Sequence, residues 1–239
     1  MNTRPNWSFS IKIPDFQNCK NLKNKTFVSA TKVVGQTRIK LNKNSDLINS
    51  LFFLFLQSNI QTMRKLKITE LNRLTPQEFK NTQKHPVVVV LDNIRSLNNV
   101  GSIFRTSDAF KLEALFLCGI TATPPHNDIH KTALGAEDAV TWQYFEHTEE
   151  AVKLLKTKGY ITIAVEQVDT SVSLTDFVPD VHKKYALILG NEVKGVQQSV
   201  IDLCDMSLEI PQFGTKHSLN VSVSAGIVIW ETVKHLIQK

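Results

Sequence analysis

The run Pro86-Val87-Val88-Val89-Val90-Leu91 opens the part of the chain whose pattern decides its fold. Consecutive β-branched and other apolar residues predict a strand that is buried on both faces, as in a parallel sheet. Further strand-like runs follow at 114–118, 140–145, 160–165, 185–189 and 207–210. Helical patterns separate or follow them at 99–110, 148–156, 196–204 and 218–237. This alternation predicts an α/β fold, with a mostly parallel sheet covered by helices on both faces.

Length and composition set outer limits on the class of protein. The chain has 239 residues, of which 42% are hydrophobic and 21% charged. A chain of this length can bury a core without disulfides. Its longest wholly apolar run, Leu51 to Leu56, is far shorter than the roughly 20 residues that span a bilayer. We therefore expect a globular protein with no membrane partner.

The positive net charge of +6 is concentrated near the N-terminus. Residues 1–62 contain nine Lys and Arg residues but only two acids, Asp15 and Asp46. Residues 63–239 contain 19 basic and 20 acidic residues, so they are nearly neutral. The total charge thus says little about what the main part of the chain binds.

The amino-acid composition and patterning of the sequence change at Met63, which suggests a domain boundary there. Residues 1–62 are rich in Asn and Lys and contain no Glu. They fit a mobile basic arm that holds RNA, a targeting segment, or an upstream stretch included by a wrong start codon. We favour the last, and expect 1–62 to be a basic extension that is disordered or a start-site artefact. The main domain is expected at 63–239, where Thr75-Pro76-Gln77-Glu78 predicts a capping box.

The cysteines and histidines give no metal signature. Cys19, Cys118 and Cys204 are far apart, with no CxxC motif, and are expected to be reduced thiols in a cytosolic protein. The seven histidines show no HxH or HExxH spacing, so no metal site is expected. Trp142 and Trp230 are expected in the core.

Three segments place unusual residues at the carboxyl ends of predicted strands, where parallel sheets bind ligands. The first is Asn99-x-Gly101-x-x-x-Arg105, although an ordinary helix cap and a surface ion pair also fit it. The second is Gly190-x-Glu192-x-x-Gly195, whose backbone amides could hold a nucleotide-like ligand, or which could be a plain turn. It lacks the Lys and Ser/Thr of a P-loop.

The third segment is Ile210-Pro211-x-x-Gly214-x-x-x-Ser218-Leu219-Asn220-Val221-Ser222. Here a strand ends at a proline, and a helix is predicted to begin near Ser218. The free amides of a helix N-terminus suit an anionic ligand, although a simple serine cap also fits. Four of the eight glycines in 63–239 lie in the three segments, which favours a shared functional role.

In this order, the three segments together resemble the three motifs of the SpoU/TrmH-type RNA 2′-O-ribose methyltransferases of the SPOUT superfamily. The resemblance covers about residues 63–239, and the stretches 121–126 and 131–136 also resemble that family. It implies a deep C-terminal trefoil knot, which general topology rules would have argued against. It also implies S-adenosyl-L-methionine as cofactor and a homodimer packed through the last helix.

The resemblance assigns roles to particular residues. It implies that Arg105 lies closest to the chemistry and that Asn99, Glu192, Ser218 and Asn220 shape the site. The cofactor would lie against the backbones around the positions Gly190, Gly195, Ile210, Pro211, Leu219 and Asn220. One departure is Phe213, where the family more often has Met.

The implied reaction is methyl transfer to a ribose 2′-hydroxyl of RNA in the cytoplasm. Compact family members without a separate RNA-binding domain often act on tRNA, at a guanosine of the D loop, and others methylate 23S rRNA. For this chain we favour tRNA slightly over 23S rRNA. Two alternatives stay open at this point: an RNA-binding protein that keeps the fold without turnover, and a nucleotide hydrolase using the 190–195 loop. The base preference is not predicted.

Overall fold

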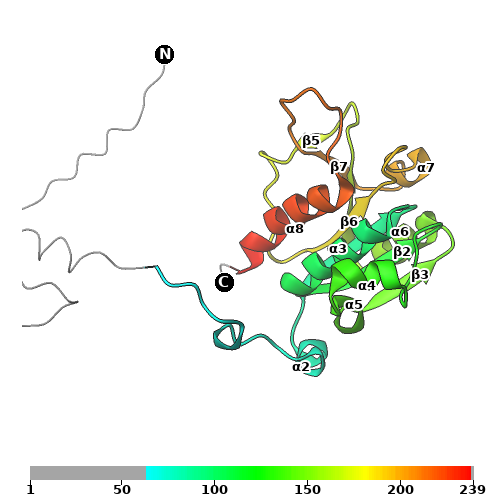
Figure 1. Ribbon diagram of the computed structural model, residues 1–239. Coiled ribbons are helices and arrows are strands. Elements are labelled where there is room, and N and C mark those ends of the chain that lie inside the picture. The colour runs from blue at the N-terminus through cyan, green and yellow to red at the C-terminus, as the bar shows by residue number, and fades with distance from the viewer. Residues whose placement is uncertain (1–62, 238–239) are drawn as a thin grey trace, which may run out of the picture. The chain divides into compact units, whose positions relative to one another are not determined.

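The computed structural model describes residues 63–237 (Figure 1). The chain divides into two compact units, Met1–Leu66 and Lys67–Lys239, and the elements below belong to the second. The expectations for 1–62 fall outside the described residues.

The centre of the second unit is a sheet of seven strands in which every neighbouring pair is parallel, as predicted. The strand order is β3-β2-β1-β6-β4-β7-β5. The strands are β1 (His85–Asp92), β2 (Leu112–Cys118), β3 (Trp142–Phe145), β4 (Tyr160–Val165), β5 (Val172–Ser173), β6 (Lys184–Leu189) and β7 (Met206–Glu209).

Helices cover both faces of this sheet. Alternate residues of β1 enter two separate clusters, with Val87, Val89 and Leu91 in one and Val88 and Val90 in the other. The first cluster includes residues of α3 (Leu97–Ala109), α4 (Asn127–Ala133), α5 (Ala136–Ala139) and α8 (Val221–Ile237). The second includes residues of α6 (Thr148–Thr157) and α7 (Gln198–Ile201). The valine run is thus buried on both faces, as predicted.

Two short helices precede the sheet, η2 (Ile68–Glu70) and α2 (Pro76–Asn81). The predicted capping box at α2 is confirmed. The Thr75 Oγ1 atom accepts a hydrogen bond from the N–H of Glu78, and the Glu78 carboxylate accepts one from the N–H of Thr75. The N–H groups of Thr75 and Glu78 are thereby satisfied.

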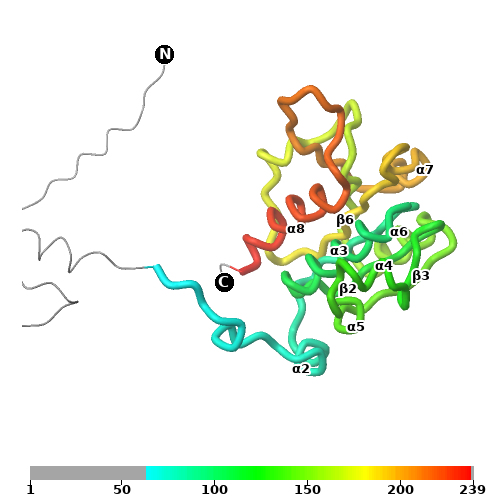
Figure 2. The backbone as a smooth tube through the Cα atoms, viewed as in Figure 1, coloured from blue at the N-terminus to red at the C-terminus, as the bar shows by residue number. Residues whose placement is uncertain are grey.

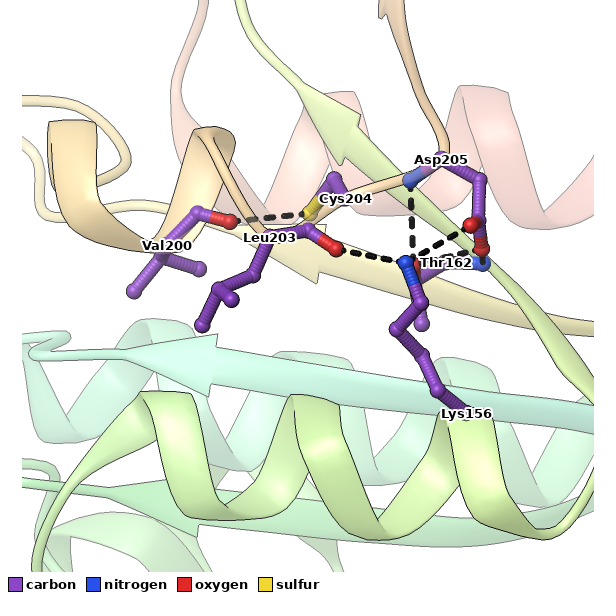
Figure 3. A network of polar contacts seen from close by, with 6 residues as sticks. All are labelled: Lys156, Thr162, Val200, Leu203, Cys204 and Asp205. Atoms are coloured by element: carbon purple, nitrogen blue, oxygen red, sulfur yellow. Dashed lines mark hydrogen bonds and ion pairs between the residues drawn. The ribbon is translucent and has the colours of Figure 1, made fainter.

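A polar network ties α6, β4 and the start of β7 together (Figure 3). The Lys156 Nζ atom lies 2.7 Å from Asp205 Oδ1 and donates to the carbonyl of Leu203 over 2.8 Å. The other oxygen of Asp205 accepts from both the N–H and the hydroxyl of Thr162, each over 2.8 Å. The thiol of Cys204 donates to the carbonyl of Val200. This network fixes the amino-terminal end of β7.

Several boundaries differ from the sequence prediction. The last helix begins at Val221 rather than near Ser218, and α7 is shorter than expected. His147 is the cap residue of α6, and the hydroxyl of Thr148 donates to the buried carboxylate of Asp92. Trp230 was expected in the core but is 50% exposed on α8, whereas Trp142 packs partly buried against the core.

Candidate active site

A cleft of about 350 Å³ opens beyond the carboxyl ends of β4, β6 and β7. This is where open parallel sheets bind ligands. Figure 2 shows the segment after β4 and the segment before α8 near each other at this end, and the side-chain amide of Gln167 donates to the carbonyl of His217 between them. Six of the predicted site residues line the cleft: Gly190, Glu192, Gly195, Ile210, Ser218 and Leu219.

The loop after β6 is a tight turn that requires its two glycines. The N–H and the carbonyl of Asn191 each bond to the backbone of Gly195, over 3.0 and 2.8 Å. A Cβ atom on Gly190 would lie 2.1 Å from the carbonyl carbon of Gly195 and from the nitrogen of Val196. Gly195 has a φ of +69°, a conformation that other residues rarely adopt. The glycines therefore let the two ends of this loop approach each other closely, and both glycines line the cleft.

Glu166, which the sequence analysis missed, supports this loop from the end of β4. One of its carboxylate oxygens accepts the N–H of Val196 and the other accepts the N–H of Gln167, both over 3.0 Å. A Cβ atom on Gly195 would lie 2.1 Å from Glu166 Oε2. Glu166 also lines the cleft, so it joins the predicted residues of the site.

A chain of hydrogen bonds connects all three sequence motifs. The amide of Asn220 donates to Asn99 Oδ1 over 3.2 Å, and the amide of Asn99 donates to Glu192 Oε1 over 2.9 Å. These residues are separated by 121 and 93 positions in the sequence. Asn99 itself is buried and lies inside α3, because Ser96 is the residue that caps this helix. Its role is therefore to connect the motifs, and it is not an ordinary cap.

Glu192 is held as a carboxylate at the N-terminus of α3. It accepts the N–H of Arg95 over 2.9 Å and that of Ser96 over 3.0 Å, in addition to the amide of Asn99. Burial alone would raise the pKa of Glu192, but these hydrogen bonds outweigh it and lower the pKa below its ordinary value. The residue stays ionised at neutral pH and joins the second motif to the first.

Asp92, at the end of β1, is a second connecting residue that the sequence analysis missed. It is fully buried, and four uncharged donors satisfy its carboxylate. These are the backbone and side-chain N–H groups of Gln197, both over 2.9 Å, the hydroxyl of Thr148 over 2.6 Å, and the amide of Asn93 over 2.8 Å. Asp92 thus ties the far end of the 190–195 loop to the end of β1 and to α6.

The third motif forms an irregular loop that leads into α8. The side chain of Asn220 accepts the N–H and the hydroxyl of Ser222, so Asn220 occupies the capping role expected of Ser218. Pro211 lies between two lining residues, Ile210 and Gln212, without lining the cleft itself. Phe213, the departure from the family pattern, is 97% exposed.

Arg105 lies outside this cleft. It is exposed on α3 and borders a separate hollow together with Lys131 and Thr132 of α4 and the side of α3. Gly101 allows this pairing of helices, because a Cβ atom there would lie 2.2 Å from Thr132 Oγ1 and 2.3 Å from the carbonyl oxygen of Ile129. Helix α3 thus bears both Asn99, which belongs to the hydrogen-bond chain, and Arg105, which lies on a surface that a large ligand can reach.

Two kinds of feature are absent from the described residues. Between 63 and 237, no helix is long and apolar enough to cross a membrane. The same stretch holds no group of three or more His, Cys, Asp or Glu side chains with the arrangement of a metal site.

The fold and the cleft define an α/β protein with a ligand site at the carboxyl edge of a parallel sheet. Comparison with known proteins identifies its family. The model of the SpoU rRNA Methylase family matches residues 86–230, which is more than half of the chain. The chain belongs to this family.

The chain is similar to several members with assigned or suggested activities. It is 32% identical over 166 residues to a 23S rRNA (guanosine-2′-O-)-methyltransferase of Neisseria meningitidis, which covers 67% of this chain and 63% of that protein. It is 27% identical to a tRNA (guanosine(18)-2′-O)-methyltransferase of Aquifex aeolicus, over 68% of this chain and 76% of that one. An uncharacterized tRNA/rRNA methyltransferase of Borreliella burgdorferi is 28% identical over 97% of this chain and 98% of its own length.

Solved structures agree with this assignment. An AdoMet-bound rRNA methyltransferase from Sinorhizobium meliloti is 27% identical and superposes with a TM-score of 0.59, over 69% of this chain and 62% of that one. The chain thus spans less than two thirds of the length of this structure and of the Neisseria relative.

Proposed function

We propose that this protein transfers a methyl group from S-adenosyl-L-methionine to a ribose 2′-hydroxyl of RNA. The observation that carries the proposal is the chain of hydrogen bonds from Asn220 through Asn99 to Glu192. It joins the two loops that line the cleft to the helix that bears Arg105. One hydrogen-bonded network therefore connects a small-molecule cleft with the helix that bears a basic residue on an open surface.

The residues of the cleft fit the cofactor. Its volume of about 350 Å³ falls in the range of small-molecule sites. Leu189, Ile210 and Leu219 offer apolar surface for an adenine ring. The glycine turn at 190–195 brings backbone groups within reach of a polar ligand, and Glu166 and Ser218 add polar side chains. The methyltransferase activity assigned to the Neisseria relative and the AdoMet-bound neighbour support the same assignment.

The chain's own residues would act by holding the methyl donor and the ribose oxygen in line. When bound, S-adenosylmethionine supplies an activated methyl group on a positively charged sulfur. A 2′-hydroxyl needs an acceptor for its proton, and the guanidinium of Arg105 is effectively always protonated. We therefore assign Arg105 to clamp the adjacent RNA phosphate, whose oxygen, or a bound water, takes the proton. Holding the two reactants in line provides most of the acceleration.

The RNA substrate is tRNA in our proposal, with 23S rRNA as the alternative. Relatives of comparable similarity carry names of both kinds. Because residues 63–239 are nearly neutral, local basic groups must contact the phosphates. Lys131 is the basic residue that shares a hollow with Arg105, where it forms an ion pair with Asp128 over 2.6 Å.

We further propose that the protein acts in the cytoplasm as a homodimer, with the trefoil knot of its family. Exposed apolar side chains at Val223, Ile227 and Trp230 share one face of α8, because they follow one another at helical spacing. An exposed apolar stripe of this kind suits a second copy of the chain. Trp230→Glu is expected to shift the protein to a monomer in light scattering, and an unchanged mass would contradict this interface.

An RNA-binding protein without turnover is the second candidate, because Arg105 lies outside the cofactor cleft. Labelled S-adenosylmethionine, incubated with the purified protein and separate pools of unmodified tRNA and rRNA, distinguishes the two. We expect label in one pool, lost with Arg105→Ala and strongly reduced with Arg105→Lys, which cannot form a planar two-point clamp. Cofactor binding without transfer to either pool would favour the second candidate. Near-full turnover of Arg105→Lys would contradict the clamp.

A further inference from the structure

The cleft is lined by more acidic than basic side chains. Its carboxylates are Glu166, Glu192 and Glu209, whereas Lys194 provides the one ammonium group and His217 an imidazole. This imbalance differs from the rest of residues 63–239, where acids and bases are nearly equal in number. The local charge of the cleft is therefore a property of its own lining.

Uncharged donors hold these carboxylates. Glu166 accepts two backbone N–H groups, and Glu192 accepts two backbone N–H groups and an amide. Glu209 accepts the hydroxyl of Ser171 over 3.5 Å. The ion pairs recorded in the described part of the chain involve other acids: Asp128, Glu137, Asp205 and Glu231. The negative charge of the cleft therefore remains available to a ligand.

We infer that this acidic lining lets the cleft distinguish the positively charged methyl donor from its neutral product, so that charge favours exchange of S-adenosylhomocysteine for fresh S-adenosylmethionine. The inference rests on the proposed function. Methyl transfer breaks the bond between sulfur and the methyl carbon, and both electrons stay on the sulfur. The ribose oxygen gains the methyl group and gives up its proton. The sulfur therefore changes from a sulfonium to a neutral thioether, while the amino-acid end of the ligand keeps the same charges.

The surroundings of the carboxylates increase the effect that this difference in ligand charge has on binding. A cleft in which charges of one sign predominate focuses its field on the bound ligand. Attraction between unit charges is several times stronger there than in water. Since the two ligands differ by a methyl group and a charge, the electrostatic contribution is the change in the ratio of their dissociation constants when a carboxylate of the cleft loses its charge.

The test measures the dissociation constants of S-adenosylmethionine and S-adenosylhomocysteine by calorimetry, with the full chain and the variants Glu166→Gln and Glu209→Gln. Glutamine keeps an oxygen that can accept the N–H of Val196 but removes the charge. Glu150→Gln is the matched control, because it removes one exposed charge from the first turn of α6, outside the cleft. Sinefungin, in which a carbon that bears an amino group replaces the methylated sulfur, separates charge from methyl contacts.

We expect the wild-type protein to bind S-adenosylmethionine more tightly than the product. Glu166→Gln should reduce this preference on the order of fivefold. Sinefungin should follow the sulfonium ligand, high salt should reduce the preference, and Glu150→Gln should leave it unchanged. Equal losses for charged and neutral ligands in Glu166→Gln would overturn the inference, because they would show only a structural role. If Glu166→Gln binds neither ligand, the same comparison of charged and neutral ligands in Glu209→Gln tests the inference. A wild-type protein that binds neither ligand would instead contradict the proposed function.

Discussion

Removing the carboxylate of Asp92 should destabilise the protein and loosen the cofactor cleft at the same time. In Asp92→Ala, four donors lose their acceptor. The amides of Asn93 and Gln197 can turn toward water, because neither residue is fully buried. The Thr148 hydroxyl, on a residue that is 1% exposed, and the partly buried N–H of Gln197 cannot do so as easily. At about 1–3 kcal/mol for each donor left unsatisfied, we expect a total loss of about 3 kcal/mol.

Urea unfolding followed by circular dichroism measures this loss. Asp202→Ala is the control, since Asp202 is exposed and makes one side-chain bond, to Gln198. It should change the free energy of unfolding by less than about 0.5 kcal/mol. Because Gln197 follows the glycine turn, Asp92→Ala should also weaken cofactor binding, whereas Asp202→Ala should not. A loss below about 1 kcal/mol in Asp92→Ala would refute the view that Asp92 anchors this loop.

Three further predictions follow from the site and its supports. Gly195→Ala should weaken S-adenosylmethionine binding in calorimetry, because its Cβ atom would overlap Glu166. Gly159→Ala is the control and should not weaken binding, since Gly159 has a similar positive φ but open space around it. Equal effects of the two substitutions would contradict the argument that Gly195 is needed for close approach to Glu166. Asn220→Ala should lower the free energy of unfolding by about 1 kcal/mol through loss of the α8 cap, and no change would show that the cap is dispensable. Burial would raise the pKa of Asp205, but the bonds from Lys156 and Thr162 outweigh it and lower the pKa below 3.8. This carboxylate therefore stabilises the fold above that pH, and the stabilisation is lost as the pH falls through the pKa of Asp205 in the folded protein. Asp205→Asn should therefore flatten the acid side of the stability–pH curve, and an unchanged curve would contradict it.

The sequence predicts those parts of the fold whose cause is local. The apolar run of β1 must be buried whatever surrounds it, and the alternation of such runs with helical patterns indicates a parallel sheet. The glycines at 190 and 195 also mark a turn by themselves. The short helices α4 and α5 and the two-residue strand β5 were missed, because elements of this length show little periodicity.

The connecting acids could not be predicted in the same way. Glu166 and Asp92 are each a single acidic residue at the end of a strand, a position usually exposed to solvent. Their importance arises from contacts with residues 30 and 105 positions away, Val196 and Gln197. Trp230 shows the converse, since an aromatic residue in an apolar helix was expected to be buried and instead lies half exposed. Whether such a residue is buried depends on which side of its helix or strand faces the core or a partner.

The most direct test of the central claim is alkaline hydrolysis of RNA that the protein has labelled from S-adenosylmethionine. A methyl group on a ribose 2′-oxygen removes the nucleophile that cleaves the adjacent phosphodiester. The account predicts that the label is recovered in alkali-resistant dinucleotides, and that no label is incorporated by Arg105→Ala. Label recovered in mononucleotides would place the methyl group on a base and would contradict the account.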